Sequence, residues 1–562
     1  MPMFIRVKKS GDRTYLQIVE NERVGGSVVQ HVVATLGRLD VLQESGQLDA
    51  LLRSGLRFSQ RLVVLDAHAS GATTTTSTRR IGPALLFGRL WQECGIRSVI
   101  DSLVGRRRFG FSIERVIFAT VLHRLFAPGS DRAAEKWMRG YAIEGVDESI
   151  DLQHFYRTMG WLGEALPEKQ QVGATPFIAR ANKDVIEEGL FALRRDLFTK
   201  LDLVFFDTTS LYFEGEGKNP LKRYGHSKDH RPDLLQVVVG VVLDEQGTPI
   251  CSQIMPGNTT DVKTLIPIAE RLTQQFGVQR VCIVADRGMI SETTVAELER
   301  LGWDYILGAR MHRVKQVCDE VLSRPGRYQE VFPERRCSHG PAPLEVKEVH
   351  VEGTRYIVCR NEEEARKDRH ARQSIVASLR EKLKHGVKSL VGNKGYRRYL
   401  KATHDALQID EARIAYEERF DGKWVLRTNT RLDTAEVALK YKQLWTVEDI
   451  FRTMKSILDT RPIFHHCADN ISGHVFCSFL ALLLRKRLQD LMQARGWQAE
   501  WADVIRDVDA VQEVSVTHQD KQFIIRTEAT GVAGKAFQAV GVPLPPVLRE
   551  VQKRGTTPKP HR

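Results

Sequence analysis

The sequence lacks a long hydrophobic run and has no cysteine pattern of the metal-binding or disulfide type. Its apolar stretches fall well short of the ~18 residues that a membrane-spanning helix needs. The opening residues, Met-Pro-Met-Phe-Ile-Arg-Val-Lys-Lys, carry no apolar core of the signal-peptide kind. The eight cysteines include no Cys-x-x-Cys pair, so neither a zinc site nor a disulfide framework is indicated. We therefore expect a protein of the reducing cytoplasm without membrane segments.

Acidic residues are fewer than basic ones, 70 against 83, which leaves a net charge of +13 and a pI near 9.3. A surplus of positive charge favours a polyanionic partner such as a nucleic acid. The 562 residues suffice for roughly three to five domains of ~100–200 residues each. An apolar content of 42% is ordinary for a globular protein that buries a large core.

Both ends of the chain differ in composition from its middle. Residues 1–67 are predicted to be a β-rich N-terminal domain, because polarity alternates over residues 1–40 as in a small β-meander. Residues 68–80 are polar and rich in Thr, which predicts a linker. Residues 81–199 repeat apolar positions every three or four residues and are predicted to be helical. Two segments follow the middle of the chain, a C-terminal region (501–551) and a basic tail predicted to be disordered (552–562).

The segment 200–308 carries continuous apolar runs, as expected for strands that are covered on both faces. Five strands and two helices are predicted in the order β-β-β-α-β-α-β. This α/β order is typical of a ribonuclease H-like core, a mixed five-stranded sheet with flanking helices in which the first and fourth strands lie side by side. Asp207 and Asp286 close the first and fourth runs, so we expect them to be neighbours despite 78 intervening residues.

The predicted core is interrupted and then completed later in the chain. Residues 309–430 contain strand-like pieces and a charged helix near 362–385, which predicts an inserted α+β subdomain. Residues 431–500 form the second part of the core, with helices predicted over 433–459 and 470–496.

The helix predicted over 433–459 carries the third acidic candidate, Glu448. An apolar stripe along it is expected to face the core, and its members recur every three or four residues: Leu444, Val447, Phe451, Met454 and Leu458. Tyr441, Glu448 and Lys455 are spaced by seven residues. On one continuous helix this spacing would align a phenol, a carboxylate and an ammonium beside the stripe.

Asp207, Asp286 and Glu448 together have the chemistry of a metal site. Two strand-end carboxylates and a helical one suffice for two divalent cations, because Mg²⁺ keeps several waters and needs few protein ligands. Each residue alone also has an ordinary explanation. Asp207 could cap the next turn, Asp286 could belong to a β-turn, and Glu448 could be part of a surface charge ladder. Their combination on a basic chain indicates chemistry on DNA or RNA strands.

These residues resemble a known family, the DDE transposases of bacterial insertion sequences. The resemblance is to the insertion-sequence-4-like group marked by Tyr-x2-Arg-x3-Glu-x6-Lys. Tyr441, Glu448 and Lys455 match that signature, and Leu444 stands at the Arg position. Further stretches are similar to family motifs: Asp207-Thr-Thr-Ser210, Pro256-Gly-Asn258 with Asp261, Ala285-Asp-Arg-Gly-Met289, and Arg461-Pro-Ile-Phe-His465 with Gly473-His474.

The resemblance implies a transposase that cleaves DNA at the ends of its element and joins those ends to target DNA. Asp207, Asp286 and Glu448 would be catalytic and would bind two Mg²⁺ or Mn²⁺ ions per active site. Tyr441 and Lys455 would contact DNA.

Further consequences of the resemblance concern partners. Arg452 or Lys442 would be the candidates to replace the missing Arg in contacting DNA. A homodimer would hold both element ends, and the helical region 81–199 is the candidate for recognising the terminal repeats. Such a protein would work in the bacterial cytoplasm, on the nucleoid when bound to DNA.

Two alternatives remain open from the sequence. A transposase-derived protein without catalysis would bind DNA ends, although the intact set of three acidic residues argues against it. A metal-dependent nuclease without strand transfer would carry the same three carboxylates.

Overall fold

The computed structural model describes residues 3–551 except 25–26, 57–63, 65–66, 69–70, 72–73, 106, 108, 196–200, 216, 218, 333–342, 385–397, 403–406 and 519–520. The predicted basic tail 552–562 lies outside the described residues. The chain divides into two compact units. The first comprises Met1–Ile81, Ala510–Thr530 and Pro543–Arg562, and the second comprises Gly82–Asp509 and Gly531–Val542.

The first unit contains the predicted β-meander. Its three strands pair in sequence order as an antiparallel sheet and are followed by two helices: β1 (Met3–Ser10), β2 (Arg13–Val24), β3 (Ser27–Arg38), α1 (Leu39–Glu44) and α2 (Gln47–Leu56). A second sheet joins both ends of the chain in the order β18-β17-β16-β4. Its strands are β4 (Thr74–Arg80), β16 (Gln512–His518), β17 (Lys521–Arg526) and β18 (Leu548–Glu550). Most of the segment expected to be a linker is therefore a strand, because Thr-rich sequence suits a β-strand once a partner such as β16 is present.

The second unit opens with the predicted helical region. Its helices are α4 (Gly82–Glu93), α5 (Ile96–Val104), α6 (Ile113–Phe126), α7 (Asp131–Met138), α8 (Leu152–Gly163), the short η1 (Glu168–Gln170) and α9 (Asn182–Arg194). Hydroxyl and carboxylate caps begin several of them. Ser112 accepts a hydrogen bond from the Arg115 amide at the start of α6, and Asp151 forms a capping box at the start of α8.

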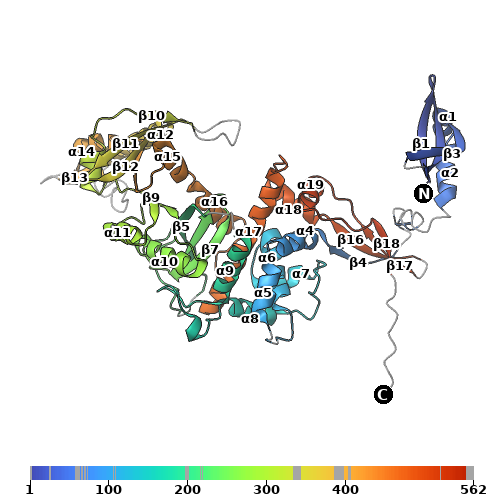
Figure 1. Cartoon of the computed structure of the whole chain (residues 1–562), viewed down its shortest axis with the longest axis horizontal. Helices are drawn as coiled ribbons and strands as arrows, with labels where there is room; N and C mark the ends of the chain where they lie inside the picture. Colours follow the sequence, from blue (N-terminus) through green and yellow to red (C-terminus); the bar gives the residue numbers. More distant parts are fainter. Residues whose placement is uncertain are drawn as a thin grey trace, which may run out of the picture. The chain divides into compact units, whose positions relative to one another are not determined.

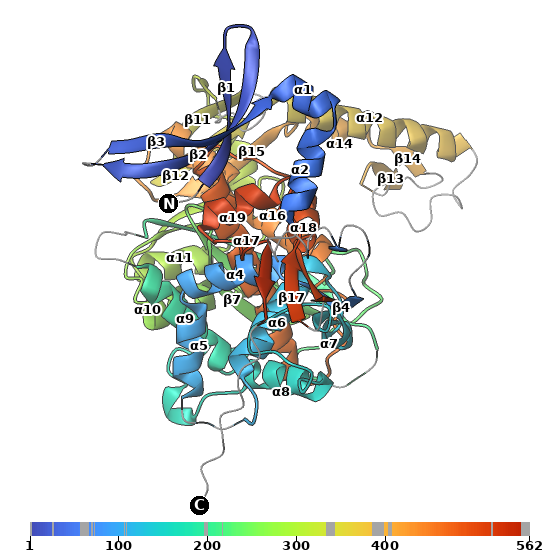
Figure 2. The same ribbon diagram turned by 90° about the vertical axis from the view of Figure 1, so that its right-hand side faces the viewer.

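Three later helices complete the helical part of this unit: α17 (Ala468–Gln493), α18 (Trp501–Asp509) and α19 (Ala533–Val540). Helix α17 contacts α4, α6 and α8, and these helices lie together in Figures 1 and 2. Helix α6 is buried on all sides from Ile113 to Leu125. No helix within the described residues is long and apolar enough to cross a membrane.

The predicted order of the five core strands is confirmed. They are β5 (Leu203–Tyr212), β6 (Gln236–Asp244), β7 (Pro249–Pro256), β8 (Cys282–Ala285) and β9 (Asp304–Gly308). They lie side by side in the order β9-β8-β5-β6-β7, with β8 parallel to both β5 and β9. The connecting helices η2 (Asp261–Lys263), α10 (Leu265–Phe276) and α11 (Glu292–Arg300) follow the predicted positions. These strands and helices are coloured green in Figure 1.

The insert between β9 and the later helices extends this same sheet. Strands β10, β11, β12 and β15 continue it beyond β9, so that nine strands form one mixed sheet. The insert comprises η3 (Gln316–Val321), β10 (Gln329–Val331), β11 (Leu344–Val351), β12 (Thr354–Arg360), α12 (Glu362–Lys384), β13 (Leu400–Ala402), β14 (Leu407–Ile409), α14 (Glu411–Glu418) and β15 (Lys423–Thr428). It contains both strands and helices, and α12 lies beside the small β13–β14 hairpin (Figure 2).

Helices cover both faces of the core strands. Side chains of Phe206, Ile283 and Leu307 pack with α10 in one buried apolar cluster. The other helices of the core are α15 (Thr434–Lys442) and α16 (Trp445–Ser456). Helix α15 contacts β8 and β9, and α16 contacts β5.

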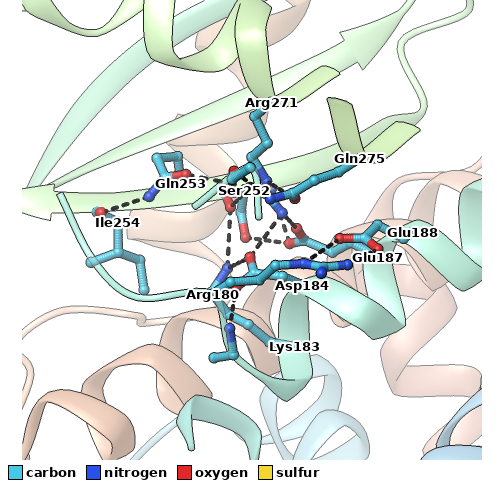
Figure 3. A network of polar contacts seen from close by, with 12 residues as sticks. Arg180, Lys183, Asp184, Glu187, Glu188, Ser252, Gln253, Ile254, Arg271 and Gln275 are labelled. Atoms are coloured by element: carbon cyan, nitrogen blue, oxygen red, sulfur yellow. Dashed lines mark hydrogen bonds and ion pairs between the residues drawn. The ribbon is translucent and has the colours of Figure 1, made fainter. Parts of the chain in front are cut away.

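A network of buried ion pairs fastens α9 to the sheet (Figure 3). The Arg271 guanidinium on α10 lies 2.8 Å from Asp184 and 2.7 Å from Glu187, both on α9. Glu187 also accepts hydrogen bonds from the amide and hydroxyl of Ser252 on β7. Lys183 neutralises Asp184 at 2.7 Å. Arg180 and Glu188 form a further ion pair beside this group (Figure 3). The network joins the helical region to the core.

Candidate active site

The pairing of β5 with β8 places Asp207 beside Asp286. The parallel ladder ends with Phe206 opposite Ala285, so the two aspartates are the next residues in register. Because side chains alternate along a strand, Asp207 and Asp286 share the face of the sheet opposite to the Phe206 cluster. Asp207 does not end its strand, contrary to the sequence prediction. Strand β5 continues to Tyr212 because β6 pairs with it as far as that residue.

Asp207 is largely buried, with 16% of its side chain exposed. Its carboxylate accepts a hydrogen bond of 2.6 Å from the Thr208 amide, and the Lys228 ammonium lies 3.6 Å away. Burial raises the pKa of Asp207 to about 6, although Lys228 and the Thr208 amide oppose the rise. The nearby carboxylates of Asp286 and Asp261 increase the pKa further. Burial is thus the main cause of the raised pKa, and the two neighbouring carboxylates add to it.

Tyr441 on α15 binds the second aspartate. Its hydroxyl donates a hydrogen bond of 3.2 Å to Asp286. The approach requires Gly308 at the end of β9, because a Cβ there would lie 2.5 Å from the Tyr441 oxygen and 2.8 Å from the Arg287 amide. Burial and the charge of Asp286 raise the pKa of Tyr441. The phenol therefore remains a neutral donor that orients the Asp286 carboxylate.

Lys228 and Asp261 add an ion pair beside Asp207. The Lys228 ammonium lies 3.6 Å from Asp261 and donates hydrogen bonds to the Thr208 carbonyl (2.7 Å) and hydroxyl (2.9 Å). The Thr208 hydroxyl in turn donates to Asp261 at 2.7 Å. Asp261 also lies close to Gly288, where an added Cβ would be 3.1 Å from its carboxylate. Lys228 thus bridges Asp207 and Asp261.

The helix predicted over 433–459 is divided into α15 and α16, which corrects the sequence prediction. Around Leu444 the hydrogen bonds run from residue i to i−3: Leu444 to Tyr441, Thr446 to Gln443, and Val447 to Leu444. Trp445-Thr446-Val447 is a run of aromatic and β-branched residues, which have modest helix propensity. Tyr441 therefore lies on a different helix from Glu448 and Lys455, and the seven-residue spacing does not describe one helix face.

The structure leaves Glu448 exposed on α16, the helix that contacts β5. Arg452 is also exposed, 3.7 Å from Asp449. Within the described residues, no group of three or more His, Cys, Asp and Glu side chains is arranged to hold a metal ion. The fold thus brings Asp207 and Asp286 together, but Glu448 does not form a group of metal ligands with them in this structure.

Lys455 is paired inside the protein. Its ammonium lies 2.7 Å from Asp229, and Arg461 lies 3.5 Å from the same carboxylate. Burial lowers the pKa of Lys455, and Asp229 opposes that shift. Leu444, at the family Arg position, is 7% exposed and packs inside. Asp229 follows Lys228 in the chain, so one loop touches both Asp207 and Lys455.

Two cavities with basic walls open beside the turn that follows Asp286, with volumes of about 510 and 400 Å³. Arg310 is held in this wall, because it donates hydrogen bonds to the carbonyls of Arg287 (3.0 Å) and Gly288 (2.7 Å). The residues lining both cavities are His226, Gly288, Arg310 and Arg313. Such a wall suits an anion such as a phosphate.

Sequence reasoning missed Lys228, Asp229 and Asp261 as site residues. Asp261 lies in a stretch with family resemblance, and that resemblance was the only signal for it. Lys228 and Asp229 belong to a loop, and nothing in their spacing relates them to Asp207 or Lys455. Their positions depend on contacts between distant parts of the chain.

The chain matches the family model described as "Transposase DDE domain" over residues 199–484, just over half of its length. The chain belongs to the DDE transposases. Residues 5–70 match a second model, described as "IS1634 family transposase, N-terminal domain". These matches confirm the resemblance to DDE transposases of insertion sequences. The membership of this transposase in the Tyr-Arg-Glu-Lys group stays a prediction.

Individual proteins resemble this chain only weakly. No curated protein matches this transposase. Among solved structures, the crystal structure of the Mos1 mariner paired end complex with Mn is 14% identical, with a TM-score of 0.13. That match covers 39% of this chain and 66% of that chain, which is just under two thirds.

Proposed function

We propose that this transposase cleaves DNA at the ends of an insertion sequence and transfers the cleaved strands into target DNA. The observation that carries the proposal is the position of Asp207 and Asp286, side by side beyond the end of the β5–β8 ladder. Family membership adds that the matched domain spans both residues. The order of the five core strands supports a ribonuclease H-like core.

The residues present fit a divalent cation. Asp207 and Asp286 supply carboxylate oxygens at one edge. Burial is the main cause of the raised pKa of Asp207, with a smaller contribution from Asp286 and Asp261, and a bound cation would stabilise the charged form of this carboxylate. Two carboxylates are a sufficient protein contribution for Mg²⁺ or Mn²⁺, which also take water and phosphate oxygens. In the proposal Glu448 completes the set for two ions, since α16 contacts β5. Bound cations would activate the attacking water or 3′-hydroxyl and stabilise the leaving oxygen.

The protein's own groups have three roles in this proposal. Tyr441 orients Asp286 through its hydrogen bond. The cavity wall with Arg310 and Arg313 binds the DNA backbone next to the reacting phosphate. Lys455 and the exposed Arg452 contact DNA from α16, and for Lys455 this requires separation from Asp229.

The remaining parts of the proposal concern assembly. A homodimer would hold the two element ends, and the helical region α4–α9 would contribute to end recognition. The net charge of +13 agrees with a DNA partner. The proposed location is the bacterial cytoplasm, on the nucleoid.

The test is a cleavage and joining assay with the full chain, Mg²⁺ or Mn²⁺, and labelled DNA that carries the sequence flanking its own gene. We expect end-specific nicks and joined products, lost in Asp207→Asn and Asp286→Asn with DNA binding retained. Glu448→Gln should also abolish both products. Asp449→Asn, which removes the adjacent carboxylate of α16, is the matched control and should keep them.

Each of the other outcomes would indicate a different function for this protein. Binding of the DNA without metal-dependent cutting would identify a transposase-derived DNA-binding protein. Cutting without joined products would identify a nuclease. Retained cutting in Glu448→Gln would remove that residue from the site and leave the two aspartates.

A further inference from the structure

We propose that Lys228 is a positioning residue that serves as a built-in counterion for Asp207 and sets the metal affinity of the site, with Asp261 as its alternative partner. The inference rests on the proposed metal-binding role of Asp207 and Asp286. Lys228 lies equally far, 3.6 Å, from the carboxylates of Asp207 and Asp261. An ammonium at this place neutralises Asp207 when no metal ion is bound.

The contacts of Lys228 explain how the ammonium could leave Asp207 without losing all its partners. Its amino group donates hydrogen bonds to the carbonyl and hydroxyl of Thr208, at 2.7 and 2.9 Å. The backbone amide of Lys228 donates to the Ser210 hydroxyl at 2.8 Å, which holds the loop on β5. When Asp207 turns to a cation, Thr208 and Asp261 retain the ammonium.

Charge balance supports this role. The carboxylates of Asp261 and Asp286 lie close enough to Asp207 to raise its pKa. Lys228 is the cation that acts most strongly on Asp207, and 30% of its side chain is exposed. A divalent cation that binds Asp207 must compete with this ammonium. Lys228 therefore weakens metal binding and stabilises the metal-free site.

Asp261 acts through Lys228 in this arrangement. Its carboxylate accepts the Thr208 hydroxyl and pairs with the ammonium, so it draws Lys228 away from Asp207. Without Asp261, Asp207 would be the one carboxylate paired with the ammonium among the described residues. Metal binding should then become weaker, and this effect should require Lys228.

The experiment measures Mn²⁺ binding to the full chain by isothermal titration calorimetry, without DNA, together with the melting temperature of each metal-free variant. We expect Lys228→Met to bind Mn²⁺ roughly fivefold more tightly, the effect of about one partly exposed ion pair. Its metal-free melting temperature should fall. Lys228→Arg keeps the charge and should return the Mn²⁺ affinity toward that of the unmodified chain.

Two further variants distinguish the inference from bulk electrostatics and from direct ligation. Lys263→Met removes an exposed lysine of η2 near Asp261 and should leave the Mn²⁺ affinity unchanged. Asp261→Asn should weaken Mn²⁺ binding in the presence of Lys228 and have a smaller effect when combined with Lys228→Met. An equal loss in both backgrounds would show that Asp261 acts directly and would overturn its proposed action through Lys228.

The remaining outcomes separate this inference from the proposed function. Absence of Mn²⁺ binding in the unmodified chain, or binding that survives Asp207→Asn, would contradict the proposed function itself. Binding that depends on Asp207 but is unchanged or weaker in a folded Lys228→Met variant would overturn only the role of Lys228.

Discussion

Lys455 and Asp229 form an ion pair of 2.7 Å in which the two side chains are only 11% and 6% exposed. Arg461 shares the same carboxylate at 3.5 Å. Asp229 therefore pairs with two cations beside the site in the absence of DNA, and its single negative charge offsets one of their two positive charges. A DNA phosphate that binds Lys455 has to compete with this internal carboxylate.

Asp229→Asn should strengthen DNA binding, because it frees Lys455 and Arg461 for phosphates. We expect roughly a three- to tenfold gain in affinity at low salt and a steeper salt dependence, by about one counterion. Fluorescence anisotropy of labelled duplex over a range of salt concentrations measures both. Asp233→Asn removes an exposed carboxylate, paired with Arg231 at 2.9 Å, in the same segment and is the control for net charge. An equal gain in both variants would show that the Lys455 pair has no special role.

Tyr441→Phe removes the hydrogen bond to Asp286 and keeps the packed ring. Loss of an outer partner of a metal ligand commonly costs about 10- to 100-fold in activity or metal affinity. We expect a loss of that size in the rate of DNA cleavage. Tyr356→Phe is the matched control, because its hydroxyl bonds to Gln316 at 3.3 Å in the insert, away from Asp286. Equal effects of the two substitutions would show that Tyr441 contributes to stability in general and has no specific role at Asp286.

The core strands could be predicted from the sequence because they are continuous apolar runs. Few sheet topologies are compatible with the order of strands and helices along the chain. Asp207 and Asp286 could be placed together from that order, since parallel neighbours in register present successive residues at the same edge. The five strands and the helices α10 and α11 follow the predicted positions. These features depend on local patterns and on one rule of topology.

Other features depend on pairing between distant segments and could not be read from local patterns. Strand β4 forms because β16 pairs with it, more than 400 residues later in the chain. The insert extends the core sheet because β15 pairs with β9. The division between α15 and α16 places Tyr441 and Glu448 on different helices, whereas helical periodicity alone predicted one continuous helix for both.

Arg271→Met should destabilise the protein through the buried network of Figure 3. The side chains of Arg271 and Glu187 are 2% and 0% exposed, and Lys183 remains to neutralise Asp184. Glu187 would then be a buried carboxylate without its cation, at a cost of about 3–5 kcal/mol in the free energy of unfolding. Urea denaturation measures the loss. Arg280→Met breaks an exposed pair with Asp304 (3.3 Å) and should cost less than ~1 kcal/mol. Similar losses in both variants would contradict the importance of the network.

Acid should destabilise the helical region through two buried histidines. Burial and the neighbouring Arg124 lower the pKa of His123 to about 4, from an ordinary value of 6.5. Burial also lowers the pKa of His474, whose Nδ1 accepts a hydrogen bond from Arg124 (2.8 Å) and whose Nε2 donates to the Thr460 carbonyl (2.9 Å). That arrangement requires a neutral ring, because a proton on Nδ1 would oppose the Arg124 donor.

The direction of the pH dependence follows from these lowered pKa values. In the unfolded chain His123 binds a proton below about pH 6.5, whereas in the folded chain it stays neutral down to about pH 4. The contribution of His123 to the free energy of unfolding is therefore fully present above pH 6.5 and decreases as the pH falls toward 4. His123 alone should account for about 3 kcal/mol over this range. Urea denaturation at pH 7, 6, 5 and 4.5 measures the slope, which His123→Gln should reduce. His350→Gln, at an exposed position on β11, should leave the slope unchanged. An equal slope in the unmodified chain and in His123→Gln would show that His123 does not contribute to the pH dependence.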